Sequence, residues 1–358
     1  MLGYWLLFLF ILIPTLTEQV NVNQTYLYKR SFSSMPIKWS IIWIIITLAI
    51  GFRHKVGGDW DAYLIYLSNA SKYNIFEIIL FSDPAYQLIN YIATNFGGGI
   101  YLVNIISGGL FAFGLVLFCQ SLPRPCLGIL VSLPYMVMII AMGYTRQSIA
   151  LGFVMLAIKS LNTGSVLKYA FWCFIAALFH KSAIVLIPLA ILFSDNNKIT
   201  VFFMVLITAL VSYFLFLQGS VDSLYTNYVE AKYQSQGTLI RLVMCVIPSV
   251  IFLFCSSHFN LNKKEKKFWT LFSFISIVSC MIFFLTSSTT AIDRLALYLQ
   301  PIQLMVLSHM PELFSKNNTI QILLLTIMYC FSVQFVWLHF AGTAFAWIPY
   351  VFYPFINL

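Results

Sequence analysis

Charged residues are scarce in this chain. They make up 9% of the 358 residues, whereas 61% are hydrophobic; a soluble domain carries about 25% charged residues. The apolar residues form continuous runs of about 17–22, long enough to cross a ~30 Å hydrocarbon core as helices. The alternating ten-residue segments of a membrane β-barrel are missing. The sequence therefore predicts an all-α polytopic membrane protein, with residues 1–358 forming a single integral membrane domain.

Several motifs are also missing. Residues 1–17 have no basic stretch and no small-x-small cleavage site, so we expect a retained helix rather than a signal peptide. The seven cysteines form no CxxC pair, which argues against a disulfide or a zinc site. A P-loop, a GxGxxG fingerprint, GxSxG and HExxH are all absent. We therefore expect no cofactor and no metal.

About twelve transmembrane helices are predicted. The apolar runs are 2–17, 37–52, 99–119, 126–142, 147–162, 166–180, 182–194, 199–217, 241–257, 268–286, 294–310 and 319–340. Residues 75–98 are split by Asp83-Pro84, which predicts two half-length interfacial or re-entrant helices. The aromatic tail, WIPYVFYPFINL, is typical of an interfacial anchor.

The basic residues orient these spans. The loop 258–267, HFNLNKKEKK, holds four lysines beside a helix end and is predicted to be cytoplasmic. Alternation from this loop leaves twelve basic and four acidic residues inside, against eight and seven outside. The loops 53–98 and 218–240 then lie on the outer face. The net charge of +9 is explained by this asymmetry, so we expect a lipid bilayer and no nucleic acid as partner.

Four of the six arginines, however, fall at predicted outer helix ends: Arg53, Arg146, Arg241 and Arg294. A cation at the start of a helix opposes the helix dipole, so Arg146 in particular calls for a negative partner or ligand. Arginine binds phosphate oxygens bidentately and stays charged. This pattern predicts an anion-handling site on the outer face, although one such arginine alone could simply extend to the lipid headgroups.

Other polar residues on the predicted outer face are candidates for the same site. His180 ends the apolar run YAFWCFIAALFH, and Asp59 and Tyr63 share one face if residues 59–63 are helical. Tyrosines in the loop 218–240, including Tyr225 and Tyr228, suit sugar stacking and equally suit an interfacial belt. Each residue also has a purely structural interpretation, so the prediction depends on their convergence.

Four segments carry a resemblance to a known family. They are GFRHKVGGDWDAY (51–63), GYTRQSIALGF (143–153), LFHKSAIVLIPL (178–189) and DRLALYLQP (293–301). In this order and spacing the chain resembles the EpsG-like branch of the Wzy polymerases, which polymerise repeat units of O-antigen, capsule or exopolysaccharide. The resemblance implies a GT-C-like glycosyltransferase fold in the bacterial inner membrane. It also implies that donor and acceptor are undecaprenyl-diphosphate-linked oligosaccharides and that the active site faces the periplasm.

Residues and resemblance together suggest one mechanism as a hypothesis. A hydroxyl of one lipid-linked unit attacks the anomeric carbon of another, and undecaprenyl diphosphate leaves without help from a metal. His180 or Asp59 is the general base. The predicted diphosphate ligands are Arg146 and Arg294, followed by Arg53 and Arg241. The predicted sugar contacts are Tyr63, Asp61, Gln147, Tyr225, Tyr228 and Tyr298. A chain-length regulator as a further partner is left open.

Other functional classes remain as alternatives. A transporter or flippase for lipid-linked sugars would carry charges near the bilayer midplane and often internal repeats, and neither is apparent in the sequence. An O-antigen ligase would share the substrate, but its largest outer loop usually comes late in the chain. A membrane acyltransferase that modifies the glycan is a third alternative.

Overall fold

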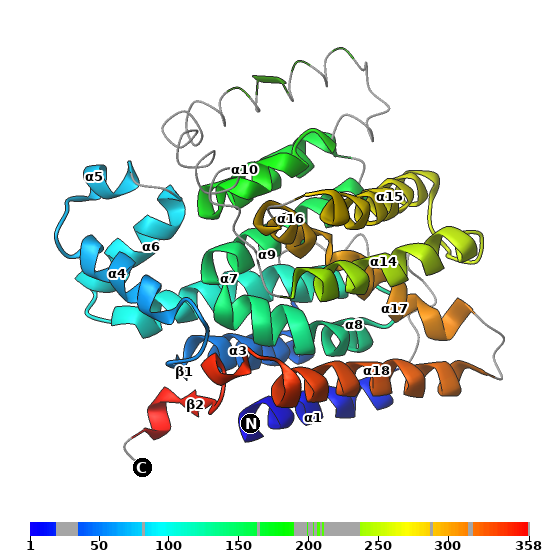
Figure 1. Cartoon of the computed structure of the whole chain (residues 1–358), viewed down its shortest axis with the longest axis horizontal. Coiled ribbons are helices and arrows are strands. Elements are labelled where there is room, and N and C mark those ends of the chain that lie inside the picture. The colour runs from blue at the N-terminus through cyan, green and yellow to red at the C-terminus, as the bar shows by residue number, and fades with distance from the viewer. Residues whose placement is uncertain are drawn as a thin grey trace.

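The computed structural model describes residues 1–18, 35–80, 83–162, 165–189, 237–286, 289–313 and 318–356, together with Ile199, Phe203, Leu206, Ile207 and Leu210. Within these ranges nearly all regular structure is helical, and the two strands have two residues each (Figure 1). The predicted span 199–217 falls almost wholly outside the described residues, and so does most of the predicted outer loop 218–240.

Most helices begin and end close to the predicted limits. The longer ones are α1 (Leu2–Leu16), α3 (Ile37–Gly51), α7 (Gly99–Cys119), α9 (Thr145–Asn162), α10 (Val166–Phe179), α14 (Thr238–Cys255), α15 (Lys263–Leu285) and α18 (Thr319–Phe340). The run 126–142 forms α8 (Pro125–Ser132), which continues as the π-helix η1 (Leu133–Ala141). Pro134 lies at the start of η1, where a missing backbone N–H favours departure from α-helical bonding.

The chain is a membrane protein by the length and composition of these helices. Among the described residues, four helices are long and apolar enough to cross a membrane: α7, α14, α15 and α18. The shorter apolar helices are α1, α3, the continuous segment Pro125–Ala141 and α10. The larger number of about twelve spans stays a prediction.

Two predicted spans differ from the structure. The run 294–310 is not one helix, because α16 (Thr290–Leu299) ends before α17 (Pro301–Leu313) begins. Pro301 has no N–H to donate and its ring disfavours continuation of the preceding turn. The run 182–194 begins as a 3-10 helix, η2 (Lys181–Leu186), in its described part. His180 is extended and starts η2, so the chain turns sharply at the end of α10.

The centre of the bundle is a close contact between two helices. α9 packs against both α7 and α10, and α7 packs in turn against α3. A Cβ added at Gly114 of α7 would lie 2.1 Å from the carbonyl oxygen of Gly152 on α9. The two helices can approach this closely only because both positions are glycine, as is common at helix contacts within membranes.

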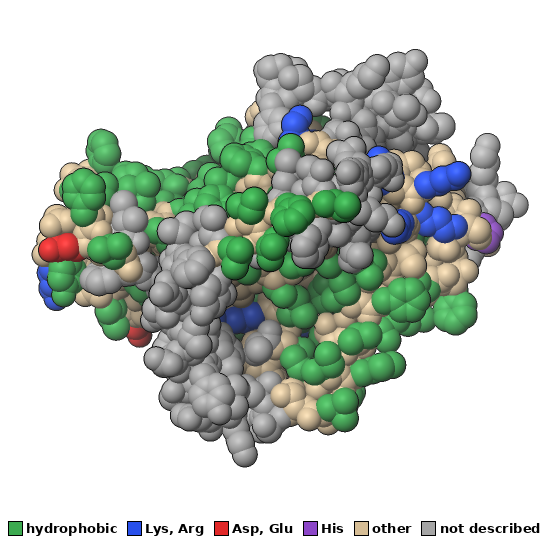
Figure 2. Space-filling view, turned by 90° about the horizontal axis from the view of Figure 1, so that it is seen from above, with side chains coloured by type: hydrophobic (Ala, Val, Ile, Leu, Met, Phe, Trp, Pro, Cys, Tyr) green, Lys and Arg blue, Asp and Glu red, His purple; other side chains and the backbone are tan. Residues whose placement is uncertain are grey.

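The bundle has two ends that differ in their side chains. At what we call the lysine end, α15 begins with exposed Lys263, Lys264 and Lys267, and Lys or Arg side chains gather on this right-hand end in Figure 2. The first turn of α15 is stabilised by a capping box between Asn262 and Glu265. At the opposite end, which we call the site end, α3 finishes, and α7 and α9 begin.

Residues 53–98 form short helices at the site end. They are α4 (Trp60–Ala70), α5 (Ile75–Ile79) and α6 (Pro84–Asn95). The predicted break at Asp83-Pro84 is where α6 starts, with Pro84 in its first turn. Both short helices predicted within 75–98 are therefore present, and α4 precedes them.

The C-terminal tail is held against the first of the motif segments. Strand β2 (Val351–Phe352) pairs antiparallel with β1 (Arg53–His54), so that Arg53 faces Phe352 and His54 faces Val351. Gly57 donates its N–H to the carbonyl of Ala346 at 2.8 Å. Its φ of +107°, together with a backbone approach that would bring a Cβ to 2.3 Å from the Met142 carbonyl, requires glycine at this position. The tail thus fixes the path of the chain that leads to Asp59.

Candidate active site

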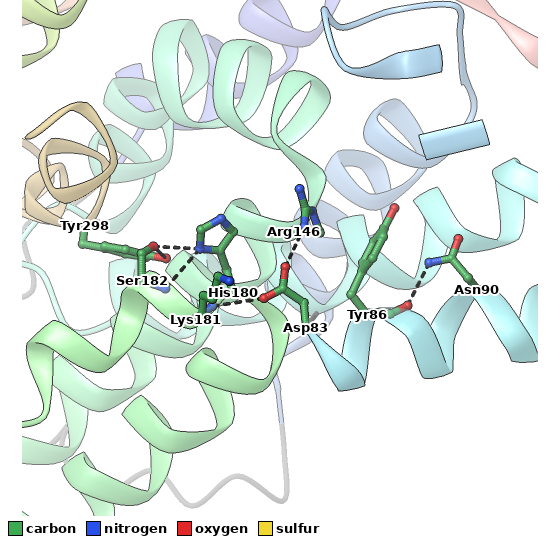
Figure 3. Close-up of polar contacts among 8 residues, drawn as sticks. All are labelled: Asp83, Tyr86, Asn90, Arg146, His180, Lys181, Ser182 and Tyr298. Carbon is green, nitrogen blue, oxygen red and sulfur yellow. Dashed lines mark hydrogen bonds and ion pairs between the residues drawn. The ribbon is translucent and has the colours of Figure 1, made fainter. Parts of the chain in front are cut away.

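Residues of the four motif segments and of the start of α6 come together at the site end, so that five separate segments contribute. They lie on the turn before α4, at the start of α6, at the start of α9, in the turn between α10 and η2, and on α16. Figure 3 shows how residues of four of these segments face one another: Asp83, Arg146, His180 with Ser182, and Tyr298.

The ion pair between Arg146 and Asp83 lies at the centre of this region. Nη1 of Arg146 donates to Asp83 at 2.6 Å, and the backbone N–H of Lys181 donates to the other carboxylate oxygen at 3.2 Å (Figure 3). Burial raises the pKa of Asp83, while the charge of Arg146 acts in the opposite direction. One carboxylate therefore links the starts of α6, α9 and η2.

Local sequence explains why this aspartate can bridge three segments. Asp83 has a left-handed backbone with φ of +59°, a conformation that aspartate tolerates better than most residues. Because Pro84 follows, the right-handed helical conformation is disfavoured at Asp83. The residue consequently turns its carboxylate into the protein instead of capping α6.

Arg146 retains hydrogen-bonding capacity after forming this pair. Its guanidinium carbon lies 4.8 Å from the centroid of the Tyr66 ring, which holds the planar group by a cation–π contact. Nε is buried and has no hydrogen-bond partner among the described residues. The side chain as a whole is 23% exposed, so the accessible part of the guanidinium, rather than the buried Nε, is suited to an oxygen atom of a ligand.

His180 starts η2 and is only 4% exposed. Its Nδ1 accepts the backbone N–H of Ser182 at 3.3 Å and lies 2.7 Å from the Ser182 hydroxyl. That hydroxyl is 3.0 Å from the hydroxyl of Tyr298 on α16 (Figure 3). Burial lowers the pKa of His180 well below its usual value, and the charges of Arg146, Arg294 and Lys181 lower it further. The imidazole is therefore neutral at pH 7.

Asp59 belongs to the same electrostatic environment. It precedes α4 but caps none of the helix N–H groups, and it is partly exposed. Burial raises the pKa of Asp59, and Arg146 and Arg294 oppose this increase. The same two arginines thus act on both predicted bases, although these are 121 positions apart in the sequence. The candidate active site itself is defined by geometry, namely the contacts of Asp83 with Arg146 and Lys181 and the hydrogen bonds that join His180, Ser182 and Tyr298.

The other two predicted phosphate ligands are engaged elsewhere. Arg53 is fully buried and donates to the Ile50 carbonyl at 2.6 Å and the Thr145 hydroxyl at 2.9 Å. It joins the end of α3 to the start of α9, and its binding of diphosphate stays a prediction. Arg241 forms an ion pair with Asp293 beneath the ring of Tyr144. A buried carboxylate thus already neutralises its charge.

The predicted sugar contacts fall into three groups. Tyr63 and Tyr298 are buried; Tyr63 packs against Tyr86, and the Tyr298 hydroxyl lies at hydrogen-bond distance from that of Ser182. Their contact with a sugar stays a prediction. Asp61 is exposed on the first turn of α4, and Gln147 is buried on α9. Tyr225 and Tyr228 lie outside the described residues.

The sequence analysis missed Asp83, Lys181 and Ser182 as site residues. Asp83 is predicted to lie on the outer face and at a helix break, but without a role in the site, and its contact with Arg146 spans 63 positions. Ser182 lies within the motif LFHKSAIVLIPL, which was the one available signal. Within the described ranges, no three His, Cys, Asp or Glu side chains are grouped closely enough to hold a metal ion.

Comparison with known proteins agrees with this arrangement of motifs. No curated protein and no solved structure shows a significant match to the chain. The model of the EpsG family matches residues 37–352, which include all four motif segments. The chain therefore belongs to the EpsG family, the family of Wzy-type polysaccharide polymerases.

Proposed function

We propose that this protein polymerises undecaprenyl-diphosphate-linked oligosaccharide repeat units at the site end of its helical bundle. The proposal includes a GT-C-like architecture in the bacterial inner membrane, with the site end toward the periplasm. The observation that carries it is the ion pair of Arg146 with Asp83 next to the hydrogen bonds that join His180, Ser182 and Tyr298, and we propose that Arg294 and Asp59 act at the same place. Two permanent cations beside two groups that can exchange protons or hydrogen bonds suit the departure of a diphosphate from a sugar.

The reaction is a glycosyl transfer. The donor is a glycan linked through its anomeric carbon to undecaprenyl diphosphate, and the acceptor is a sugar hydroxyl on a second lipid-linked unit. A new bond forms between the acceptor oxygen and the anomeric carbon as the bond from that carbon to the diphosphate oxygen breaks. The electrons of the broken bond leave with undecaprenyl diphosphate, and the hydroxyl proton passes to a base of the protein.

Each residue has a proposed role in this reaction. Arg146 and Arg294 bind the oxygens of the leaving diphosphate, where negative charge develops. Asp83 positions Arg146 by accepting a hydrogen bond from its Nη1, and the exposed part of the guanidinium is left for the ligand. Asp59 is suited to accept the proton because its raised pKa makes it a stronger base than an ordinary aspartate. Asp61 and Gln147 remain proposed sugar contacts.

The orientation of the chain can be tested by cysteine labelling. Ser71 is exposed at the site end and Lys263 at the lysine end. In bacterial spheroplasts, a Ser71→Cys variant should react with a membrane-impermeant thiol reagent and a Lys263→Cys variant should not, because the lysine end is retained in the cytoplasm. The unsubstituted chain, whose described cysteines are buried or half-buried, is the control. Reaction at Lys263→Cys alone would reverse the orientation and place the site in the cytoplasm.

We also expect polymerisation to need no divalent metal, since arginines neutralise the leaving group. Purified protein incubated with lipid-linked repeat units should form a ladder of glycan lengths at the same rate with or without excess EDTA. A ladder that disappears with EDTA and returns with Mg²⁺ or Mn²⁺ would contradict the arginine account. Asp59 and Asp61 would then become candidate metal ligands.

A further inference from the structure

The two nitrogens of a neutral histidine have different capacities, since one carries the proton and donates while the other accepts. The hydrogen-bond partners of His180 determine which of its nitrogens carries the proton and which accepts. The backbone N–H of Ser182 points at Nδ1 from 3.3 Å, and a backbone amide can only donate. Nδ1 is therefore the acceptor, and the ring proton resides on Nε2.

The hydrogen bonds of Ser182 and Tyr298 have the same donor-to-acceptor order, toward Nδ1. With Nδ1 as acceptor, the Ser182 hydroxyl at 2.7 Å donates its proton to the ring. The oxygen of Ser182 is then available to accept the hydroxyl proton of Tyr298 at 3.0 Å. Tyr298 is completely buried, so α16 supplies a fixed support for this order of hydrogen bonds. Figure 3 shows the opposite edge of the imidazole turned away from both residues.

The same arrangement opposes proton uptake by His180. A proton on Nδ1 would face the Ser182 amide proton and would break the bond that starts η2. The neighbouring charges also disfavour an imidazolium, because Arg146 on α9, Arg294 on α16 and Lys181 on η2 are all cationic and Asp83 is paired with Arg146. A ring held in this state is poorly suited to act as a general base.

We propose that His180 is a hydrogen-bond donor to the leaving diphosphate through Nε2–H, and that Ser182 and Tyr298 are positioning residues that hold it in this tautomer. The ligand class is an oxyanion, bound jointly by Arg146, Arg294 and a neutral imidazole. A neutral donor adds a directional hydrogen bond where charge develops and adds no further positive charge. This inference rests on the proposed function, and it leaves proton removal from the acceptor to Asp59.

The tautomer can be measured without any substrate. Nitrogen-15 NMR of the full-length, histidine-labelled protein in lipid nanodiscs reports the protonation of each ring nitrogen. The His180 signals are assigned by their loss in His180→Gln, against the background of His54, His258, His309 and His339. We expect an unprotonated Nδ1 and a protonated Nε2 at pH 7. A proton on Nδ1, or an imidazolium, would overturn the inference.

Activity separates a donor from a base. The amide nitrogen of glutamine reaches the position of Nε2, whereas that of asparagine reaches the position of Nδ1. We expect His180→Gln to stay within about tenfold of the wild-type rate and His180→Asn to lose about 10²–10³-fold, the usual effect of removing an oxyanion donor. His309→Gln, a substitution of a buried histidine on α17, is the control. Equal, severe loss in both His180 variants would contradict a donor role.

Ser182 provides the third measurement. Ser182→Ala should shift part of the His180 population to the other tautomer and slow the reaction about tenfold. Ser182→Thr keeps the hydroxyl and should therefore keep both the wild-type tautomer and the wild-type rate. Ser276→Ala, where the hydroxyl bonds only its own helix at Phe272, should change neither. Unchanged tautomer populations in Ser182→Ala would remove Ser182 as a positioning residue. A protein with the expected tautomer and no polymerising activity would instead refute the proposed function and leave the tautomer assignment intact.

Discussion

Substitution of Arg146 by lysine is expected to slow polymerisation by about 10²–10³-fold, the range found when one donor to a developing oxyanion is lost. The arginine donates from Nη1 to Asp83, and the exposed part of its guanidinium is left for a ligand. Lysine is a single point charge and cannot present a planar fork in two directions. It would be drawn to the buried carboxylate of Asp83, and the diphosphate would lose its contact. The measurement is the initial rate of glycan extension, with membrane levels checked by blot.

A matched substitution exists at the lysine end. Arg124 forms an ion pair with Glu312 at 2.7 Å, and its side chain is 8% exposed against 23% for Arg146. Arg124→Lys therefore repeats the same chemical change in a comparable ion pair far from the site. We expect near-normal activity from it. If Arg146→Lys also gave full-length glycan at the wild-type rate, Arg146 would not bind the diphosphate.

Asp59→Asn is expected to reduce the rate by about 10²–10⁴-fold, the typical effect of removing a general base. The amide is nearly isosteric with the carboxylate and cannot accept the proton. Because Asp59 caps no helix N–H, folding and insertion should be preserved. Glu77→Gln is the control, since Glu77 is an exposed carboxylate whose capping-box role glutamine can share. A normal rate in Asp59→Asn would remove Asp59 as the base.

The pH profile of the wild-type protein gives a second check on Asp59. A base must be unprotonated to act, so activity should fall as the pH drops through its pKa. Burial raises that pKa, which places the loss of activity above the ordinary range of an aspartate. This decrease in activity at low pH should vanish in Asp59→Asn and persist in His180→Gln, because His180 is held neutral and does not take up the proton.

Local patterns predicted much of the fold. The limits of α7 and α18 agree with the predicted spans, because a continuous apolar run sets both hydropathy and helix length. Gln300-Pro301 was overlooked in the run 294–310, where hydropathy alone suggested one helix. The pairing of β1 with β2 could not be predicted, since two-residue strands have no periodic pattern and their partners lie about 300 positions apart.

The sequence could indicate which residue types gather at the candidate site, but it could not indicate which of them contact one another. Arginine at predicted outer helix ends marked the region in which Arg146 pairs with Asp83 and His180 bonds Ser182, while the roles of these residues stay predictions. Whether an arginine faces a ligand or a carboxylate depends on tertiary contacts. Arg53 and Arg241 therefore looked equivalent to Arg146 in sequence, although one is buried among backbone and hydroxyl acceptors and another is paired with Asp293.

The central claim is that this chain joins lipid-linked repeat units by glycosyl transfer. The most direct test places purified protein in liposomes with undecaprenyl-diphosphate-linked repeat units of one defined structure. The account predicts a ladder of glycans that differ by one repeat unit, with one undecaprenyl diphosphate released for each new bond. Repeat units that cross the bilayer unextended would indicate a transporter, and transfer to an acceptor without a lipid diphosphate would indicate a ligase. Either result, from wild-type protein that is folded and inserted, would contradict the account.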